Sequence, residues 1–324
     1  MARPSDPQPK QVWASLITNL SYLPGLLTLH HSLQQVQTAY PFVALYTSTF
    51  PDPGLAALAA RGIRTYPVPS LTPSKISREY EQDPRFRETW TKLVVFSLEG
   101  VFERIVLLDG DMLVRRNMDE LMEVPLDGDV DEDEDEDEGE EQGEGKRVFA
   151  ASHACACNPF KKAHYPAHWI PQNCAFTTQH TTPTLAQTTG APVTSGVGML
   201  NSGLLVVNPS LASFARIQSL LDTPEKVNSY TFPDQELLSE AFKDRWVPLP
   251  YVYNALKTMR AEGVHSAIWR DQEVKNVHYI FAVKPWQEQP PREGPGMDVL
   301  NGWWWEANWE RQALERERGI EDGY

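Results

Sequence analysis

The chain of 324 residues is poor in cysteine and has no long apolar run. Its three cysteines, Cys155, Cys157 and Cys174, cannot all pair with one another, and a chain of this length needs no disulfide framework. A reducing compartment is therefore expected. No stretch of about 18 apolar residues occurs, and the first residues, MARPSDPQPKQ, are polar and rich in proline, so we expect neither a signal peptide nor a membrane-spanning helix. These features predict a cytoplasmic protein with no membrane partner.

The net charge of −15 comes almost entirely from one segment. Residues 127–144 hold 13 carboxylates and no basic residue, so the rest of the chain carries a charge of only −2. Such a dense run of like charge repels itself, which predicts a disordered, solvated insertion over residues 127–147. The nearly neutral remainder lacks the clustered basic face that nucleic acid requires, so no nucleic-acid partner is expected.

Short apolar runs alternate with helical patterns along the first half of the chain. They predict, in order, a strand at 12–18, a helix at 24–37, a strand at 41–47, a helix at 53–62, a strand at 63–69, a helix at 89–100 and a strand at 104–109. This alternation predicts an α/β fold with a mainly parallel central sheet flanked by helices. Ligands of such sheets bind beyond the carboxyl ends of the strands.

The same kind of pattern resumes after the acidic insertion. Strands are predicted at 148–152, 199–210 and 274–281, and a helix at 232–242, before a tryptophan-rich helical segment near the C-terminus. We therefore predict a single domain over residues 12–318, interrupted by the insertion and preceded by a disordered N-terminus at residues 1–11.

Two aspartates, Asp109 and Asp111, stand where the most continuous apolar strand ends, in LLDGDML. Residues i and i+2 of an extended segment point to the same side, so both carboxylates can face one ion. Gly110 between them allows a ligand to approach the backbone closely. Two carboxylate ligands with room for phosphates suit Mg²⁺ or Mn²⁺.

Two other interpretations of this pair remain open from the residues alone. A polar turn after a strand is common. Phosphatases that use the first aspartate as nucleophile carry a similar motif, usually on their first strand and with Thr or Val four residues later. Here the pair lies beyond residue 100 and Leu113 stands at that position, so the metal site is favoured over the phosphatase.

A third ligand could come from His278, which lies in the apolar segment VKNVHYIF. A lone histidine in such a strand is more often a hydrogen-bonded core residue than a metal ligand. Lys284 follows at the exit of the predicted strand, where a cation could meet phosphate.

Seven segments together resemble the family 8 glycosyltransferases, the group that contains glycogenin and the plant galactinol synthases. In family order they are SLITNLSY (15–22), TKL (91–93), LLDGDM (107–112), LNSGLLVVNPS (200–210), DQELL (234–238), LPYVYN (249–254) and HYIFAVKPW (278–286). The resemblance implies a fold of the GT-A type, the nucleotide-diphospho-sugar transferase fold.

The resemblance also implies roles for individual residues. Uridine would be held by Leu16, Thr18, Asn19 and Tyr22. The cation, Mn²⁺ or Mg²⁺, would be bound by Asp109, Asp111 and His278. Lys92 would contact the donor and Lys284 the diphosphate. The sugar and acceptor site would be lined by Asn201, Ser202, Asp234 and Gln235, and the residues expected to act in catalysis are Asp234, Gln235 and Lys92.

The expected reaction is transfer of a hexose from a UDP-sugar. Charge develops on the departing UDP, where a divalent ion and a lysine can stabilise it. Family members retain the anomeric configuration. A front-face displacement needs no enzyme nucleophile, whereas a double displacement would use a carboxylate, for which Asp234 is the best candidate. The front-face route is favoured by analogy with the family.

The segment between the YN motif and His278 distinguishes between the two groups of the family that the chain resembles. Glycogenin glucosylates its own tyrosine between the YN motif and the metal histidine, but residues 255–277 contain no tyrosine. The segment HSAIWRDQEVKNVHY (265–279) instead resembles galactinol synthases. We expect UDP-glucose or UDP-galactose as donor and a small polyol or glycan as acceptor. A glycogenin-like enzyme, an inactive nucleotide-sugar-binding protein and a homodimer remain open.

The three cysteines could also bind zinc with His153, His164 and His168. Their spacing fits no standard zinc module, so reduced cysteines in or near the core are favoured.

Overall fold

The computed structural model describes residues 9–73, 75–76, 89–127, 146–290 and 298–324. Residues 1–8 of the predicted disordered N-terminus and residues 128–145 of the predicted acidic insertion lie outside this part of the chain. The described ends correct both boundaries. The first strand already begins at Gln11. Asp127 and Arg147 are joined by a backbone hydrogen bond of 2.9 Å and an ion pair of 2.7 Å, because they are the two ends of the insertion and face each other.

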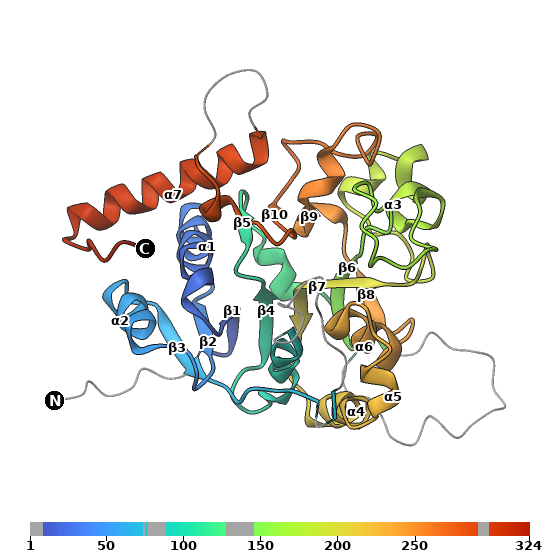
Figure 1. Cartoon of the computed structure of the whole chain (residues 1–324), viewed down its shortest axis with the longest axis horizontal. Coiled ribbons are helices and arrows are strands. Elements are labelled where there is room, and N and C mark those ends of the chain that lie inside the picture. The colour runs from blue at the N-terminus through green and yellow to red at the C-terminus, as the bar shows by residue number, and fades with distance from the viewer. Residues whose placement is uncertain (1–8, 74, 77–88, 128–145, 291–297) are drawn as a thin grey trace.

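A central sheet of seven strands runs through the molecule in the order β3-β2-β1-β4-β7-β6-β8 (Figure 1). The strands are β1 (Gln11–Ile17), β2 (Phe42–Tyr46), β3 (Arg64–Pro67), β4 (Arg104–Leu108), β6 (Phe149–His153), β7 (Leu200–Val207) and β8 (Trp246–Pro248). Neighbouring strands are parallel except at β7, which pairs antiparallel with both β4 and β6. The predicted mainly parallel sheet is confirmed.

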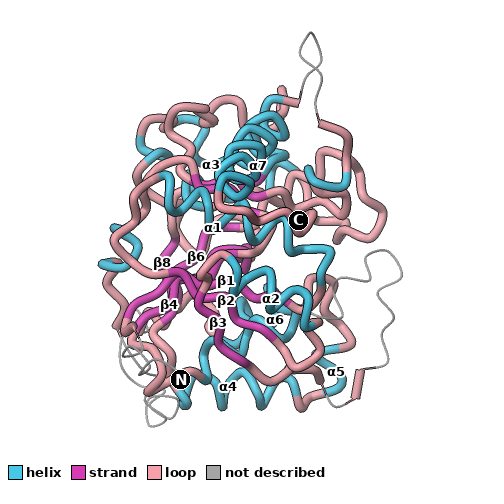
Figure 2. Tube along the Cα trace, turned by 90° about the vertical axis from the view of Figure 1, so that its left-hand side faces the viewer, coloured by secondary structure: helices cyan, strands magenta, loops and turns pink. Residues whose placement is uncertain are grey.

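Helices cover both faces of this sheet, because alternate residues of its strands point to opposite sides. Val12 and Ala14 of β1 pack in one core layer with α4 (Leu211–Leu221) and α6 (Pro233–Ala241). Trp13 and Ile17 pack in the other layer with α1 (Leu23–Gln35) and α2 (Asp52–Ala60). Figure 2 shows the strands between α1 on one side and α4 on the other. Two short helices are α3 (Ala175–Thr178) and α5 (Pro224–Val227).

The segment predicted as an α-helix over 89–100 forms 3₁₀ turns over Thr89–Ser97 instead. It is rich in β-branched residues, which lose side-chain freedom in an α-helix. Its residues from Trp90 to Phe96 are all buried, so packing against the sheet outweighs the helical pattern of the sequence.

A second, small sheet stands beside the carboxyl end of β4. It consists of β5 (Met112–Val114), β10 (Asn276–His278) and β9 (Ala255–Leu256), in the order β5-β10-β9. The strand predicted over 274–281 therefore ends at His278, because its partner β5 has only three residues to pair with. The register places His278 opposite Met112, next to Asp111.

The last helix, α7 (Val299–Glu317), lies across α1, as Figure 1 shows. Asp298 caps its first turn by accepting hydrogen bonds from the backbone of Leu300 and Asn301. The Thr28 hydroxyl of α1 and the Asn308 amide oxygen of α7 are 3.1 Å apart. Among the residues that the structure describes, no helix combines the length and the apolar character needed to cross a membrane.

Candidate active site

A cavity of about 590 Å³ opens beyond the carboxyl ends of β1 and β4, where an α/β sheet is expected to bind its ligand. The residues predicted from the sequence gather there. Those that line the cavity are Leu16, Thr18, Asn19, Tyr22, Lys92, Asp109, Asp111, Asn201, Ser202, Asp234, Gln235 and His278.

The predicted uridine residues lie at one end of the cavity. Leu16 is in β1, and Thr18, Asn19 and Tyr22 stand in or before the turn that joins β1 to α1. The Asn19 amide donates to the Thr18 hydroxyl at 3.2 Å. The Tyr22 ring meets the Trp286 ring edge to face, with centroids 5.9 Å apart. These contacts form a corner with apolar and polar walls, which suits a planar base.

The two aspartates leave β4 in a turn that is bonded on both sides. The Asp109 amide donates to the Gly203 carbonyl of β7 at 2.8 Å, and the Tyr279 amide donates to the Asp111 carbonyl at 2.9 Å. His278 Nε2 lies 3.8 Å from a carboxylate oxygen of Asp109 and 3.4 Å from one of Asp111. The central and small sheets thus bring together two residues of one turn and a third from a distant strand.

The orientation of His278 follows from a chain of hydrogen bonds that starts at a backbone amide. The Gly203 N–H can only donate, so the Asn201 side-chain atom 3.1 Å away is its oxygen. That oxygen also accepts from the Asn254 amide nitrogen at 2.8 Å, which leaves the Asn254 oxygen to face His278 Nδ1 at 2.9 Å. His278 Nδ1 must therefore carry the proton and donate.

In the neutral imidazole, this proton position directs the lone pair of His278 Nε2 at the two carboxylates. Three acceptors that converge repel one another unless a cation stands between them. Their ligand atoms all lie within 4.8 Å of one another. Two carboxylate oxygens and one imidazole nitrogen are ligands that Mn²⁺ and Mg²⁺ accept. The residues present therefore fit a divalent cation.

Close packing keeps His278 in this orientation. A Cβ atom added at Gly203 would lie only 2.7 Å from His278 Nδ1 and 3.0 Å from the Asn201 side-chain oxygen. Any larger residue at position 203 would push the imidazole ring away. The close contact with His278 therefore requires glycine at this position.

Two buried lysines balance the acidic charge. Lys92 Nζ lies 2.9 Å from Asp109 and 3.3 Å from Asp234. Burial alone would lower the pKa of Lys92, but these two carboxylates outweigh it and hold that pKa above its ordinary value. Burial raises the pKa of Asp109, with the neighbouring Asp111 adding to the effect against the opposing charge of Lys92.

Lys284 is the one predicted site residue that lies behind the cavity wall. Its side chain is 1% exposed, and its ammonium donates to the Asp111 carboxylate and, at 2.7 Å, to the Tyr279 carbonyl. Burial would raise the pKa of Asp111, but the charge of the Lys284 ammonium outweighs it and holds that pKa well below its ordinary value. In this structure Lys284 therefore keeps Asp111 ionised.

Sequence reasoning missed two parts of the site. Asn254 orients His278. The only sign of this residue in the sequence was its position in the YN motif, to which no role had been assigned. The other part is an aromatic wall of Tyr165, Trp169 and Phe232, which lines the cavity. The Trp169 and Phe232 rings stack with centroids 4.7 Å apart, and Tyr165 meets Phe232 edge to face at 5.0 Å. No periodicity marks Tyr165 and Trp169, because they lie in an irregular loop.

The fold and this cavity define a glycosyltransferase of the GT-A type, which binds a nucleotide sugar at the edge of its sheet. The chain belongs to glycosyl transferase family 8, whose family model matches residues 14–289.

Comparisons with known proteins agree with this membership. Galactinol synthase 1 of Solanum lycopersicum is 24% identical over 306 residues, which cover 89% of this chain and 79% of the relative. Among solved structures, an active-site mutant of LgtC aligns with a TM-score of 0.58 and 15% identity, covering 92% of this chain and 95% of that chain. The bifunctional glycosyltransferase WbbM aligns with a TM-score of 0.57 and 16% identity, covering 97% of this chain. This chain spans about half, 53%, of the WbbM chain.

Proposed function

We propose that this hexosyltransferase moves glucose or galactose, with retention of configuration, from a UDP-sugar to a separate small polyol or carbohydrate acceptor. The observation that carries the proposal is the convergence of Asp109, Asp111 and His278 at the floor of the cavity. The similarity to galactinol synthases, together with the absence of tyrosine from residues 255–277, favours a galactinol synthase-like acceptor over self-glucosylation.

The donor would lie with its uracil at the Tyr22 end and its diphosphate above the two aspartates. When bound there, Mn²⁺ or Mg²⁺ supplies Lewis-acid stabilisation of the charge that develops on the departing UDP. Lys284 holds Asp111 ionised, and Asn254 holds His278 with its Nε2 lone pair toward the cavity. Lys92, between Asp109 and Asp234, places a second positive charge beside the donor site.

For the stereochemistry we propose front-face displacement, with Asp234 as a positioning residue. The Asp234 side chain is 5% exposed, accepts a hydrogen bond from the Ser202 hydroxyl and lies 3.3 Å from Lys92 Nζ. Both interactions withdraw electron density from the carboxylate, which weakens it as a nucleophile. Gln235 accepts from the Asn201 amide at 2.8 Å and completes the same wall.

The acceptor would meet the aromatic wall. Tyr165 and Trp169, in the loop between β6 and β7, offer apolar ring surface to the cavity together with Phe232, which immediately precedes α6. Sugars and cyclic polyols bind such faces through their C–H groups while their hydroxyls bind polar neighbours. This wall would also exclude water, which would otherwise hydrolyse the donor.

The test is a panel of UDP-sugars with Mn²⁺, crossed with myo-inositol and simple glycans as acceptors. We expect turnover with UDP-glucose or UDP-galactose that requires the metal and a separate acceptor. Binding of UDP-sugar without turnover on any acceptor or water would instead identify a nucleotide-sugar-binding protein.

Intact mass of the protein after incubation with donor and Mn²⁺ separates the remaining alternatives. We expect an unchanged mass. A ladder of hexose additions would restore the glycogenin-like alternative, and a single hexose mapped to Asp234 would establish double displacement.

A further inference from the structure

Three cysteines and one histidine converge in the interior at a second place, apart from the carboxylate site. Cys155 and Cys157 follow β6, Cys174 directly precedes α3, and His265 comes from the segment between β9 and β10. His265 Nε2 lies 3.3 Å from the Cys155 sulfur, 3.2 Å from that of Cys157 and 3.5 Å from that of Cys174. All four ligand atoms lie within 4.8 Å of one another.

Hydrogen bonds to His265 alone do not account for this arrangement. One imidazole nitrogen has a single lone pair, so it can accept a hydrogen bond from only one of three thiols. The other ring nitrogen of His265 is already engaged, with Nδ1 2.9 Å from His180 Nε2. A disulfide between two of the cysteines would still leave the third sulfur beside the same nitrogen.

The distances match the edges of a zinc coordination tetrahedron. Zn–S bonds of about 2.3 Å and a Zn–N bond of about 2.0–2.1 Å at tetrahedral angles place the nitrogen about 3.6 Å from each sulfur. The three measured separations lie within a few tenths of an ångström of that value. With Nε2 as the ligand, His265 Nδ1 would carry the proton and donate it to His180 Nε2, which is the kind of hydrogen-bond partner that ligating histidines usually have.

We propose that Cys155, Cys157, Cys174 and His265 bind a structural zinc ion. Four protein ligands fill a tetrahedral shell and leave no open position for substrate, which is the property of structural rather than catalytic zinc. Soft thiolates select zinc over the hard Mn²⁺ and Mg²⁺ that suit the carboxylate site. Cys157, Cys174 and His265 are buried, and Cys155 lies at the edge of the cavity with 9% of its surface exposed.

The ligand set corrects the histidines considered from the sequence. His153 contacts the carbonyls of Ala191 and Pro192 at 3.0 and 3.1 Å, His164 lines the cavity, and His168 is exposed. His265 was not considered, because it lies 110, 108 and 91 residues from the three cysteines.

The ion would hold the acceptor side of the cavity in place. The loop between β6 and β7 contains Cys155, Cys157 and Cys174, and also Tyr165 and Trp169 of the aromatic wall. Connections of this length are uncommon in compact domains and are usually functional. Zinc would join it to the segment that carries His265. This consequence rests on the proposed function, whereas zinc binding does not.

Metal content tests the site directly. The full chain, expressed in zinc-containing medium and purified without chelators, should contain about one zinc ion per chain by elemental analysis. Replacement of zinc by Co²⁺ should give a thiolate-to-metal charge-transfer band. Cys174→Ser should lose both signals. The matched controls His168→Ala and Asp111→Asn should keep the zinc, because neither residue is a ligand.

If Cys174→Ser does not fold, His265→Cys keeps the test open, since four thiolates still form a zinc site and should retain the ion. A wild-type protein without zinc whose three thiols react with a thiol reagent, or in which two have formed a disulfide, would overturn the proposal. Neither outcome depends on activity. Removal of zinc should then raise the KM for the acceptor more than the KM for the donor.

Discussion

The direction of a single backbone N–H, that of Gly203, determines what His278 can bind. It sets the orientation of Asn201, which sets that of Asn254, which makes His278 Nδ1 the donor. The chemistry of the cavity floor therefore depends on residues that need not touch substrate. The predictions for this scale separate the metal ligands from their supports.

Replacement of either aspartate by asparagine should lower kcat/KM by roughly 100-fold or more, because a metal ligand is lost. The two variants should differ in stability. In Asp109→Asn, Lys92 keeps Asp234 as its partner, so the melting temperature should change little. In Asp111→Asn, the buried Lys284 loses its carboxylate and the melting temperature should fall. Asp244→Asn, at an exposed site, is the matched control. A fully active Asp111→Asn protein would contradict the metal assignment.

Gly203→Ala should reproduce the effect of His278→Ala without changing a ligand. The added methyl group displaces the imidazole ring, so the Mn²⁺ concentration for half-maximal activity should rise by about 10- to 100-fold. Metal titration of activity and thermal melting are measured together for both variants. If either protein melts early but keeps the normal Mn²⁺ dependence, His278 is a core residue and not a ligand.

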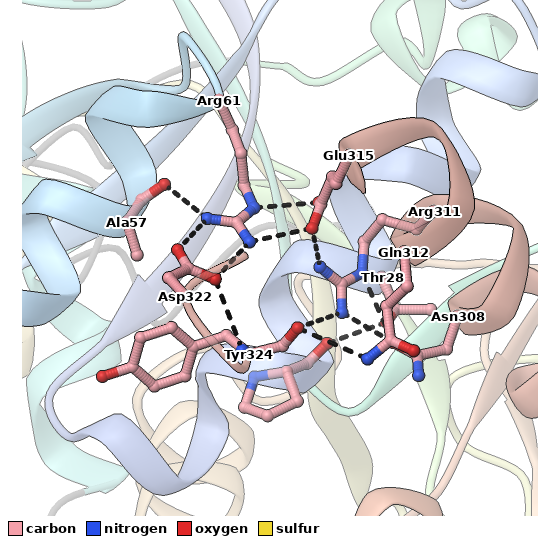
Figure 3. Close-up of polar contacts among 10 residues, drawn as sticks. Thr28, Ala57, Arg61, Asn308, Arg311, Gln312, Glu315, Asp322 and Tyr324 are labelled. Carbon is pink, nitrogen blue, oxygen red and sulfur yellow. Dashed lines mark hydrogen bonds and ion pairs between the residues drawn. The ribbon is translucent and has the colours of Figure 1, made fainter. Parts of the chain in front are cut away.

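At the scale of secondary elements, the docking of α7 depends on a buried ionic network. The Arg61 guanidinium at the end of α2 donates two hydrogen bonds to Glu315, at 2.9 and 2.8 Å, and Arg311 donates a third at 2.7 Å (Figure 3). The side chains of Arg61 and Arg311 are 6% and 3% exposed. Arg61 also binds Asp322, and Arg311 donates to the Tyr324 carbonyl. The network joins α2 to α7 and to the segment that follows it.

Glu315→Ala should therefore lower the free energy of unfolding by about 3–5 kcal/mol, because two buried guanidinium groups lose their shared carboxylate. Glu317→Ala removes the same charge from an exposed position of the same helix and should stay within about 0.5 kcal/mol. Urea denaturation of the two variants and the wild type measures the difference. If both variants lost the same free energy of unfolding, the effect of Glu315→Ala would come only from the change in net charge and not from the network.

Helix α1 carries a histidine that should make the fold sensitive to acid. His30 packs against Phe42 with ring centroids 5.3 Å apart, and burial, with the charge of His31, lowers the pKa of His30 to about 4 from an ordinary 6.5. Above pH 6.5 this group is neutral in both states and has no effect. As the pH falls from 6.5 to 4, only the unfolded chain gains the proton, so stability is lost.

We expect this one group to cost about 1–2 kcal/mol of unfolding free energy at pH 5. His30→Gln should remove that part of the loss between pH 7.5 and pH 5 in urea denaturation, whereas His168→Gln, at an exposed position, should not. A loss of the same size in His30→Gln and in the wild type would contradict the assignment.

At the scale of the whole molecule, the two described ends of the acidic insertion, Asp127 and Arg147, lie at the opposite end of the central strands from the active site. The insertion returns at Arg147, just before the start of β6, which runs parallel to β4. The cavity lies beyond the carboxyl end of β4. β4 has five residues and therefore spans about 17 Å. Because the metal ligands follow its carboxyl end and the insertion joins the opposite end of the strands, at least this distance separates them.

Replacing residues 128–145 with a short Gly/Ser bridge should leave kcat and KM nearly unchanged. Asp127 and Arg147 already face each other, and loop length changes the closure free energy by only about 0.6 kcal/mol per doubling. Steady-state kinetics with donor and acceptor are compared before and after the deletion. A large fall in kcat would show that the acidic segment acts on the site.

Sequence pattern alone was sufficient for the features set by neighbouring residues. The i, i+2 spacing of Asp109 and Asp111 predicted a shared face at the end of a strand, and alternating runs predicted the sheet and most of its helices. These inferences succeed because strand geometry and apolar periodicity act over a few residues. Pattern failed over Thr89–Ser97, where burial on all sides produced 3₁₀ turns.

What the tertiary structure alone decided are contacts between residues far apart in the chain. The sequence indicated that His278 could be a ligand, but the orientation of its ring depends on Asn254 and Asn201, which reach it from other elements. Lys284 lies behind Asp111 rather than in the cavity, because the chain turns after β10. His265 meets three cysteines about a hundred residues away. Local spacing determines which side a residue faces, whereas the paths of loops and the packing of whole elements determine which residue it meets.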